Sequence, residues 1–314
     1  MANPFFKVIR SVLLWAAGNQ TCKNIVSKLP FTKPVVKRFI SGESVEDALA
    51  VIAELKAKGI RTTIDFLGED TTDVDQAYVV RDAYLELLDK LVERGLIDSC
   101  EVSIKLTALG AGLPNGEEIA FSVAESIVKA ANEAGTTATV DMEDHTVTDF
   151  TLGIVKRLRE QYPSTGTVLQ AYLFRTVDDA KDFSGPGSRI RLCKGAYKEP
   201  ATVAYQEKAD VDAAYLKALQ VLIDGQGRPM VASHDPAIIS SAIEAFEKSG
   251  RDKDSYEFQM LYGIRTDAQE KLAQDGYNMT VYVPYGTEWW GYFVRRLAER
   301  PANLLFFLRA LVGK

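Results

Sequence analysis

Two adjacent arginines near the end of the chain, Arg295 and Arg296, are the residues whose type and spacing first suggest chemistry. A guanidinium can hold a carboxylate through two parallel hydrogen bonds, so the pair suits a carboxylate ligand. Adjacent helical side chains point about 100° apart, and both reach one ligand only when it lies near the helix axis. Tyr292 shares a helical face with the pair, and Thr287 is a candidate cap. The alternative is a solvated basic patch at a helix C-terminus, and the spacing leaves both open.

Short β-branched or apolar runs that alternate with longer amphipathic stretches are the main organising pattern from residue 61 onward. The predicted strands are 62–68, 100–107, 137–143, 167–173, 189–195, 229–235, 256–262 and 279–285. The stretches between them, such as 79–95 and 119–135, end on glycines, as helices do. Strands and helices in this alternation are typical of a closed parallel barrel, and no G-x-G-x-x-G follows the first strand. We predict the α/β class, with a (βα)₈ TIM-type barrel over residues 61–314.

Residues 1–60 are predicted to form N-terminal helices packed on this barrel. In the clearest one, Ser44 is the candidate cap and Gly59 ends the helix, whereas Pro30 and Pro34 break the preceding segment. Residues 4–18 combine basic and apolar residues, but their apolar run is far below the roughly 18 residues of a membrane span. We interpret them as a docked amphipathic helix, with peripheral contact to a membrane surface as the alternative.

The predicted strand ends are unusually polar for a barrel. The carboxyl ends of the strands form the active face of such barrels, and side chains chosen only for packing would be Val, Ile or Leu. The polar residues there are Asp65, Glu69, Lys105, Thr107, Asp141, Glu143, Asp144, Gln170, Arg191, Lys194, His234, Asp235, Gln259 and Tyr282. As a group they predict a catalytic or binding site, although any single charge could be paired for structure. A second hypothesis is an aldolase-like barrel in which Lys105 or Lys194 forms a Schiff base.

Composition narrows the classes of partner and compartment. The formal charge of −6 argues against a nucleic-acid partner, whose phosphates attract basic surfaces. Three cysteines lie far apart, and with only two histidines no metal site of the usual spacing is expected. The expected location is therefore the reducing cytoplasm. If residues 4–18 contact a membrane surface, that surface would be the inner face of the membrane.

Several short motifs across the predicted barrel occur together in one family. They are FLGED (66–70), SIKLT (103–107), VDMED (140–144), LQAYL (169–173), RLCKGAY (191–197), ASHD (232–235), EFQMLYG (257–263), YVPYG (282–286) and YFVRRLAERPAN (292–303). In this order they resemble proline dehydrogenase, both the bacterial monofunctional form and the matching domain of bifunctional proline-utilisation proteins. The resemblance implies an FAD-dependent barrel that oxidises L-proline to Δ1-pyrroline-5-carboxylate. A hydride would pass from proline C5 to flavin N5, and the electrons would then pass to a quinone.

The resemblance also implies roles for individual residues of the substrate site. Arg295 and Arg296 would bind the proline carboxylate with help from Lys105, and Asp141 would orient these cations. Tyr282 and Leu261 would form walls around the proline ring, with Tyr292 beside the arginine pair. Glu69 would close the site through an ion pair with one of the two arginines. The residues expected to be catalytic are Asp141, Arg191 and Tyr282.

For the cofactor, Arg191 is expected beside flavin N5. The other FAD contacts that the resemblance implies are Met142, Gln170, Cys193, Lys194, Gly195, Ala196, Tyr197, Ser233 and His234. Two of these have a structural alternative: His234 as a satisfied core histidine and Cys193 as a small hydrophobic residue. The Ser-His-Asp sequence at 233–235 departs from the commoner Thr-His-Asn, and His145 receives no role.

Overall fold

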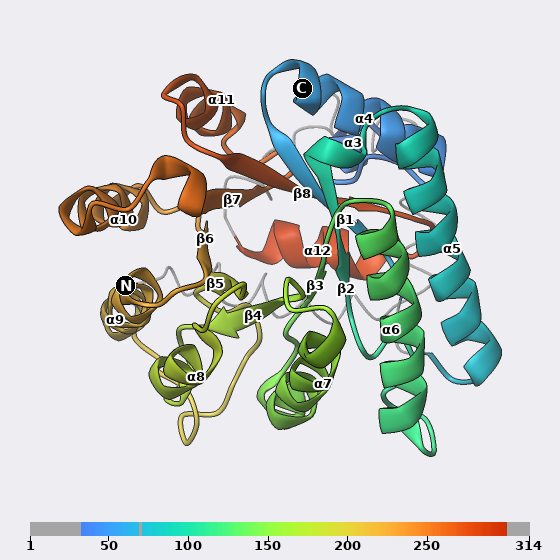
Figure 1. The fold of residues 1–314 in the computed structure, drawn as a ribbon, viewed down its shortest axis with the longest axis horizontal. Helices are drawn as coiled ribbons and strands as arrows, with labels where there is room; N and C mark the ends of the chain where they lie inside the picture. Colours follow the sequence, from blue (N-terminus) through green and yellow to red (C-terminus); the bar gives the residue numbers. More distant parts are fainter. Residues whose placement is uncertain (1–32, 69–70, 300–314) are drawn as a thin grey trace.

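Eight parallel strands close into a barrel in the computed structural model, which describes residues 33–68 and 71–299 (Figure 1). The strands are β1 Arg61–Phe66, β2 Cys100–Ile104, β3 Ala138–Val140, β4 Gly166–Gln170, β5 Arg189–Cys193, β6 Arg228–Ala232, β7 Glu257–Leu261 and β8 Met279–Tyr285. They follow one another around the barrel in chain order, and β8 pairs with β1 to close it. The predicted (βα)₈ class is confirmed.

Each predicted strand is present, but most end two or three residues earlier than the sequence pattern indicated. The run 189–195, for example, is a strand only to Cys193, and 229–235 is a strand only to Ala232. The extra residues lie in the loops at the carboxyl edge. These loops carry the polar motifs, and the sequence pattern did not distinguish the end of each strand from the start of its loop.

The two faces of each strand differ in character, as β2 shows. Cys100, Val102 and Ile104 belong to the apolar layer beneath the surrounding helices. Glu101 and Ser103 alternate with them, and they contact arginines of β5 across the barrel. Because successive side chains of a strand point to opposite faces, this alternation gives the barrel an apolar outside and a polar inside.

Helices cover the outside of the barrel between successive strands (Figure 1). They are α5 Val74–Glu93, α6 Gly116–Glu133, α7 Thr148–Gln161, α8 Thr176–Phe183, α9 Lys208–Asp224, α10 Pro236–Ser249 and α11 Thr266–Gln274, with short 3-10 turns at Ile97–Ser99, His145–Val147 and Lys253–Ser255. Asp73 caps α5 by accepting a hydrogen bond from the Gln76 amide. Gly95, just after α5, has a φ of 63°, a left-handed conformation that glycine adopts without penalty.

The helix predicted after Ser44 is α4, Val45–Ala57, and it packs against β1 and β8. Ser44 and Asp47 form a reciprocal capping box at its start, and Gly59 follows its end with a φ of 72°. Pro34 was predicted to break the segment before α4, and it lies within the short helix α3, Lys33–Lys37. Proline fits there because amides in the first turn have no partner within the helix. Pro30 and residues 4–18 lie outside the described residues.

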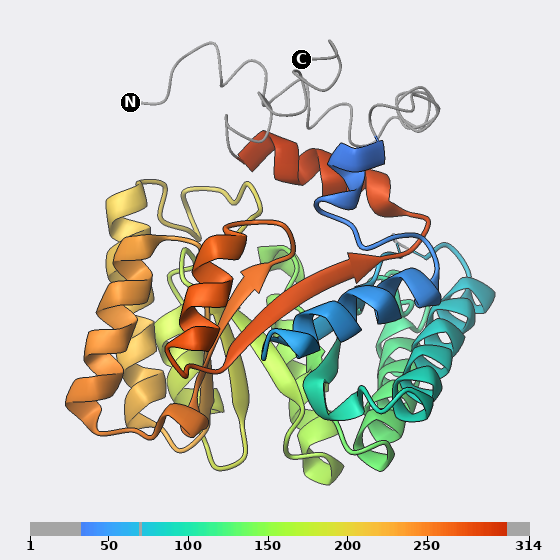
Figure 2. The same ribbon diagram turned by 90° about the horizontal axis from the view of Figure 1, so that it is seen from above.

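The last described helix, α12 Trp289–Glu299, lies across one end of the barrel beside α3 (Figure 2). It begins at Trp289, so Thr287 lies one position too early to be the cap. Phe293 packs on Phe39 with ring centroids 6.2 Å apart, and the Trp289 indole donates a hydrogen bond to Glu43 at 2.8 Å. The segment before α4 therefore holds α12 over the barrel.

The same N-terminal segment is hydrogen-bonded to β8 and the loop after it, and it packs against the loop after β7. The Ser41 amide donates to the Pro284 carbonyl at 3.0 Å, and the Gly286 amide donates to the Gly42 carbonyl at 3.0 Å. Near β7, Gly263 lies so close to the chain that a Cβ built on it would be 1.7 Å from the Arg38 carbonyl oxygen. Only glycine allows this approach.

Within 33–68 and 71–299, no helix has the length and apolar character needed to cross a bilayer.

We predict that Gly263→Ala destabilises the protein by about 2 kcal/mol more than Gly59→Ala, because overpacking adds to the backbone penalty. Both glycines have a left-handed φ, 71° and 72°, but a Cβ at Gly59 meets nothing within 4 Å. Chemical denaturation of the two variants measures the difference. Equal losses of stability would contradict the close packing of Arg38 on Gly263.

Candidate active site

A cavity of about 480 Å³ lies between the carboxyl ends of the strands and helix α12. Its size is typical of sites for small molecules and cofactors. It is lined by Lys105, Asp141, Met142, Val168, Gln170, Arg191, Cys193, Lys194, Gly195, Ala196, Tyr197, Lys208, Ala232, Ser233, His234, Asp235, Gln259, Met260, Leu261, Tyr282, Tyr292, Arg295 and Arg296. The substrate and cofactor residues that the resemblance implied are all in this set except Glu69, which lies outside the described residues. Of the polar strand-end residues, Asp65, Thr107, Glu143 and Asp144 are not part of the lining.

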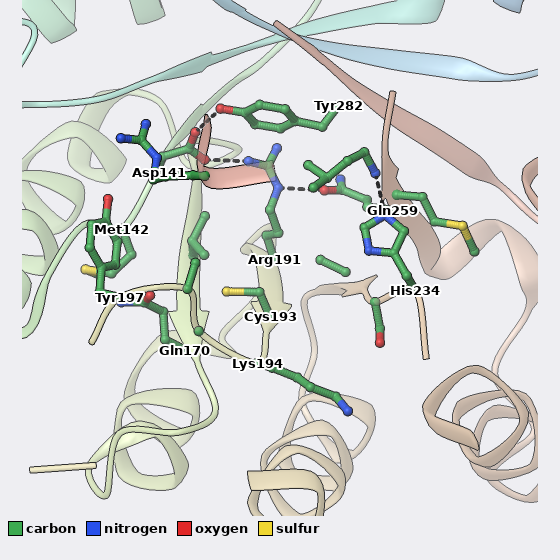
Figure 3. Close-up of a pocket in the computed structure, with 18 of the residues that line it drawn as sticks. Asp141, Met142, Gln170, Arg191, Cys193, Lys194, Tyr197, His234, Gln259 and Tyr282 are labelled. Atoms are coloured by element: carbon green, nitrogen blue, oxygen red, sulfur yellow. Dashed lines mark hydrogen bonds and ion pairs between the residues drawn. The ribbon is translucent and has the colours of Figure 1, made fainter. Parts of the chain in front are cut away.

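Arg191 of β5 lies at the centre of the cavity floor and is 5% exposed (Figure 3). Its Nη1 donates to Asp141 Oδ1 at 2.5 Å and to the Ser103 hydroxyl at 2.9 Å. Its Nε donates to Gln259 Oε1 at 2.6 Å, and its Nη2 donates to the Thr63 hydroxyl at 3.1 Å. Side chains from β1, β2 and β7, together with Asp141 directly after β3, therefore fix this guanidinium in one orientation.

Tyr282 of β8 and Lys105 after β2 share the carboxylate of Asp141 with Arg191. The Tyr282 hydroxyl donates to Asp141 Oδ2 at 2.8 Å, and Lys105 Nζ lies 3.9 Å from the same oxygen. Lys105 also donates to Asp65 Oδ2 at 2.5 Å and to the Tyr282 hydroxyl at 3.2 Å. Burial, followed by the charge of Asp141, raises the pKa of Tyr282 well above its ordinary value, so its hydroxyl remains a hydrogen-bond donor at neutral pH.

These contacts refine the role expected for Asp141. The resemblance implied that it orients Arg295, Arg296 and Lys105. Its carboxylate lies 3.9 Å from Lys105, and its hydrogen bonds go to Arg191 and Tyr282. All of these lie within the barrel rather than on α12. Asp141 thus organises the floor of the cavity.

The arginine pair of α12 lines the cavity from the opposite side. Arg295 is exposed and Arg296 is half-buried, with its guanidinium carbon 5.0 Å from the centroid of the Tyr292 ring. Both side chains therefore face the same cavity as Lys105. This placement favours the carboxylate-binding interpretation over a solvated patch.

The loop after β5 forms another wall, and Gly195 is its tightest point. Gly195 has a φ of 112°, and a Cβ there would lie 2.5 Å from ring atoms of Tyr172. The Tyr172 hydroxyl in turn contacts Gln170 Oε1 at 3.2 Å, and the Gln170 amide nitrogen donates to the Glu143 carbonyl at 2.8 Å. The backbone of this loop is therefore open to a ligand on its other side.

Cys193 and His234 each had a structural alternative, and their contacts are now defined. Burial raises the pKa of the Cys193 thiol to about 12, so it is a neutral, partly exposed wall of the cavity at pH 7. His234 Nε2 accepts a hydrogen bond from the Leu261 amide at 2.9 Å, and its carbonyl accepts one from Arg265 at 2.8 Å. His234 is thus both tied to β7 and part of the cavity wall (Figure 3).

Charged residues gather at the end of the cavity formed by the loops after β5 and β6. Lys194 donates to Asp235 Oδ2 at 2.7 Å and also to Asp212, while Lys208 donates to the same two carboxylates. Hydrogen bonds from Lys194 lower the pKa of Asp235 most strongly, so this carboxylate is ionised at neutral pH. Lys194 and Lys208 therefore line one end of the cavity, where both are paired with carboxylates.

Some residues of the site gave no signal in the sequence. His145, to which no role was given, is hydrogen-bonded through its ring and its amide to Glu199, and Glu199 also accepts from Tyr172 at 3.2 Å. This joins the loops after β3, β4 and β5. Among the described residues, no group of three or more His, Cys, Asp or Glu side chains is arranged to hold a metal ion.

Comparison with known proteins agrees with this geometry. The family model described as "Proline dehydrogenase" matches residues 48–309. The chain is 36% identical over 307 residues to "Proline dehydrogenase 1" of Bacillus subtilis subsp. natto, which covers 98% of this chain and 100% of that one. It is 39% identical over 281 residues to "Proline dehydrogenase" of Deinococcus radiodurans, with 88% of this chain and 90% of that one covered.

A solved structure gives the same assignment in three dimensions. The crystal structure of proline utilization A from Bdellovibrio bacteriovorus superposes with a TM-score of 0.79 at 26% identity. The match covers 91% of this chain and 38% of that longer one. The closed barrel and its charged cavity define an enzyme of the (βα)₈ class. The chain belongs to the proline dehydrogenase family, and it is related to the monofunctional bacterial members over nearly their whole length.

We predict that Asp141→Asn lowers the free energy of unfolding by about 2–3 kcal/mol, because it leaves the buried Arg191 with one counter-charge fewer. The matched control is Glu118→Gln, which breaks the exposed Glu118–Arg157 pair and should leave stability almost unchanged. Denaturant titration compares the two. The same Asp141 variant should turn over substrate more slowly, and full activity would remove Asp141 from the site.

Proposed function

We propose that this chain uses FAD to oxidise L-proline in the cavity beneath α12 and passes the electrons to a quinone. The reaction of the family is the oxidation of proline to Δ1-pyrroline-5-carboxylate, the first step of proline catabolism. One observation carries the proposal for the site. The cavity brings Lys105, Asp141, Arg191 and Tyr282 from the strand ends together with the arginine pair of α12.

The residues around the cavity fit a flavin dinucleotide. Gly195 lines the cavity and, having no side chain, exposes its backbone there. Lys194 and Lys208, at one end of the cavity, each use two of three N–H donors on Asp212 and Asp235, and the third would be available to a diphosphate. Arg191 places a buried guanidinium on the floor, where it would stabilise negative charge on the ring system. When bound, FAD would supply the acceptor for the hydride from proline C5, at flavin N5.

The chain itself would hold and orient the amino acid. Arg295 and Arg296 would grip the proline carboxylate from α12, with Lys105 on the barrel side. The Tyr282 ring, 9% exposed, and Leu261 would flank the proline ring and limit access of water. Cations around the site would also favour the neutral form of the substrate amine, which is the form that can release hydride.

A peripheral contact with the membrane remains part of the proposal, because a quinone acceptor partitions into the bilayer. The residues that would make this contact, 4–18, lie outside the described part of the chain. Binding of the full chain to lipid vesicles, compared with a chain lacking these residues, would test it. The expected place of action is the cytoplasm and the inner face of the membrane.

The Schiff-base alternative predicts different behaviour of the purified protein. In the structure, Lys105 donates hydrogen bonds to Asp65 and Tyr282, and Lys194 donates to Asp235, so both amines are engaged as ammonium donors. The flavin proposal predicts a yellow protein that proline bleaches without oxygen. A colourless chain that becomes covalently labelled by substrate and borohydride at either lysine would support the alternative.

We predict that Arg295→Met and Arg296→Met each raise the KM for proline about 10- to 100-fold while FAD remains bound, since a hydrogen bond to a charged group contributes about 1.5–3 kcal/mol. Arg94→Met is the control, because Arg94 is exposed and pairs with Glu46 on the outside of the barrel. Steady-state kinetics and flavin absorbance measure both properties. An unchanged KM in both α12 variants would refute the carboxylate role.

We predict that Arg191→Met lowers the reduction potential of the flavin and slows its reduction by proline. The variant removes the buried positive charge that would stabilise the reduced ring. Stopped-flow reduction under anaerobic conditions measures the rate, and a titration against redox dyes measures the potential. A normal rate together with a normal potential would place Arg191 away from the flavin ring.

A further inference from the structure

Beneath Arg191, a second layer of charged side chains fills the barrel on the amino-terminal side of the strands. Glu101 of β2 and Glu257 of β7 are 3% and 2% exposed. Arg189 donates to Glu101 Oε2 at 2.5 Å and lies 3.9 Å from Glu257 Oε2, to which Arg228 donates at 3.0 Å. None of these four residues lines the cavity.

Glu101 is the carboxylate that joins this layer to the floor of the site. Its Oε1 is 3.4 Å from Arg191 Nη2, and its Oε2 accepts from Arg189. The Thr137 and Thr139 hydroxyls donate to it at 3.1 and 3.4 Å, which fixes the carboxylate in place. Glu101 thus lies between two arginines of the same strand.

The charges inside the barrel balance within the described residues. The cations are Lys105, Arg189, Arg191 and Arg228, and the carboxylates are Asp65, Glu101, Asp141 and Glu257. Burial is the largest single effect on the pKa of Arg191 and would lower it, but neighbouring groups, led by Asp141 and then Glu101, together raise it. Arg191 therefore pairs with two carboxylates, Asp141 at the cavity and Glu101 beneath it.

We propose that Glu101 is a positioning residue for the redox step: it holds Arg191 from below and offsets part of the positive charge that Arg191 presents to the cavity. This inference rests on the proposed function, in which Arg191 lies beside the flavin. A carboxylate that offsets this charge disfavours the reduced cofactor, because reduction adds negative charge to the ring. Glu101 thus lowers the potential that Arg191 would otherwise set.

The decisive variant is Glu101→Gln, which removes the charge and keeps the shape and an acceptor oxygen. We expect the equilibrium constant for flavin reduction to rise about tenfold, which corresponds to ~30 mV for a two-electron couple. The potential is measured on the FAD-loaded enzyme against redox dyes. An unchanged potential in this variant overturns the proposal.

Two comparisons show whether the effect passes through Arg191. Glu257→Gln removes an equally buried charge that contacts Arg189, Arg228 and Gln259 but reaches Arg191 only through Gln259. Because Gln can still accept the hydrogen bond from Gln259, the potential of this variant should stay within about twofold of the parent in equilibrium constant. In the Arg191→Met background, Glu101 has no guanidinium charge left to offset. Glu101→Gln should therefore no longer raise the potential, so the effects of the two substitutions should not add. An equal rise in Glu257→Gln, or an undiminished rise without Arg191, would show a general charge effect and overturn the positioning role.

Glu101→Gln leaves Arg189 with less compensation and could fail to fold, and the double variant Glu101→Gln/Arg189→Gln covers that outcome. It removes one charge of each sign and keeps the interior neutral. The rise in potential should persist at smaller size, because the lost carboxylate contacts Arg191 directly and the lost guanidinium lies beyond it. A potential equal to the parent in this folded variant also overturns the proposal.

The same measurements separate this inference from the proposed function. If the parent chain binds no flavin, or if proline does not reduce its flavin, the proposed function fails before Glu101 is tested. If proline reduces the flavin and Arg191→Met lowers the potential, the proposed function stands. The response of Glu101→Gln then decides the inference alone.

Discussion

The contact between the guanidinium of Arg191 and the carboxylate of Asp141 is the interaction on which the rest of the site depends. Removing both charges from water costs several kcal/mol per ion, and one ion pair seldom recovers that cost. The barrel recovers it with further hydrogen bonds from Ser103, Gln259 and Thr63. Each added contact comes from a different strand, so the closed sheet must form before the pair is stable.

The site has two halves with different mechanical support. The floor is built on strands and held by the network around Arg191, which suits a cofactor whose ring must not move. The roof is α12, which packs through a hydrophobic cluster against α3 and Phe39. Backbone hydrogen bonds in turn hold this N-terminal segment to Pro284 and Gly286. A roof supported by side-chain packing can shift more easily than the floor, so substrate entry is expected there.

The sequence predicted the fold well because its signals are local. Strand runs, glycine ends of helices and the Ser44 cap depend on neighbouring residues, and all appear in the structure. The errors were local as well: strands were extended into polar loops, and Pro34, expected to break the segment before α4, lies in α3. In each case the residue type was interpreted correctly, but its position within the element was not.

The candidate site could be listed from the sequence, but its connections could not. Family motifs contain most of the residues that line the cavity, from Lys105 to Arg296, but not Val168 or Lys208. Glu101 and Glu199 were missed because nothing in one sequence indicates which distant cation or histidine meets a carboxylate. One signal was available for Glu101: in 100–105, polar residues alternate with apolar ones, and this pattern extends the polar face one step below Lys105.

The equal numbers of positive and negative side chains inside the barrel also constrain how the sequence can diverge. A single neutral substitution at Arg189 or Glu257 would leave an excess charge in the interior, whereas a matched exchange of both residues would not. Relatives should therefore differ at these positions in pairs, with the sum of interior charge preserved. We therefore expect these charged positions to covary across the barrel axis among relatives, and not each to be invariant.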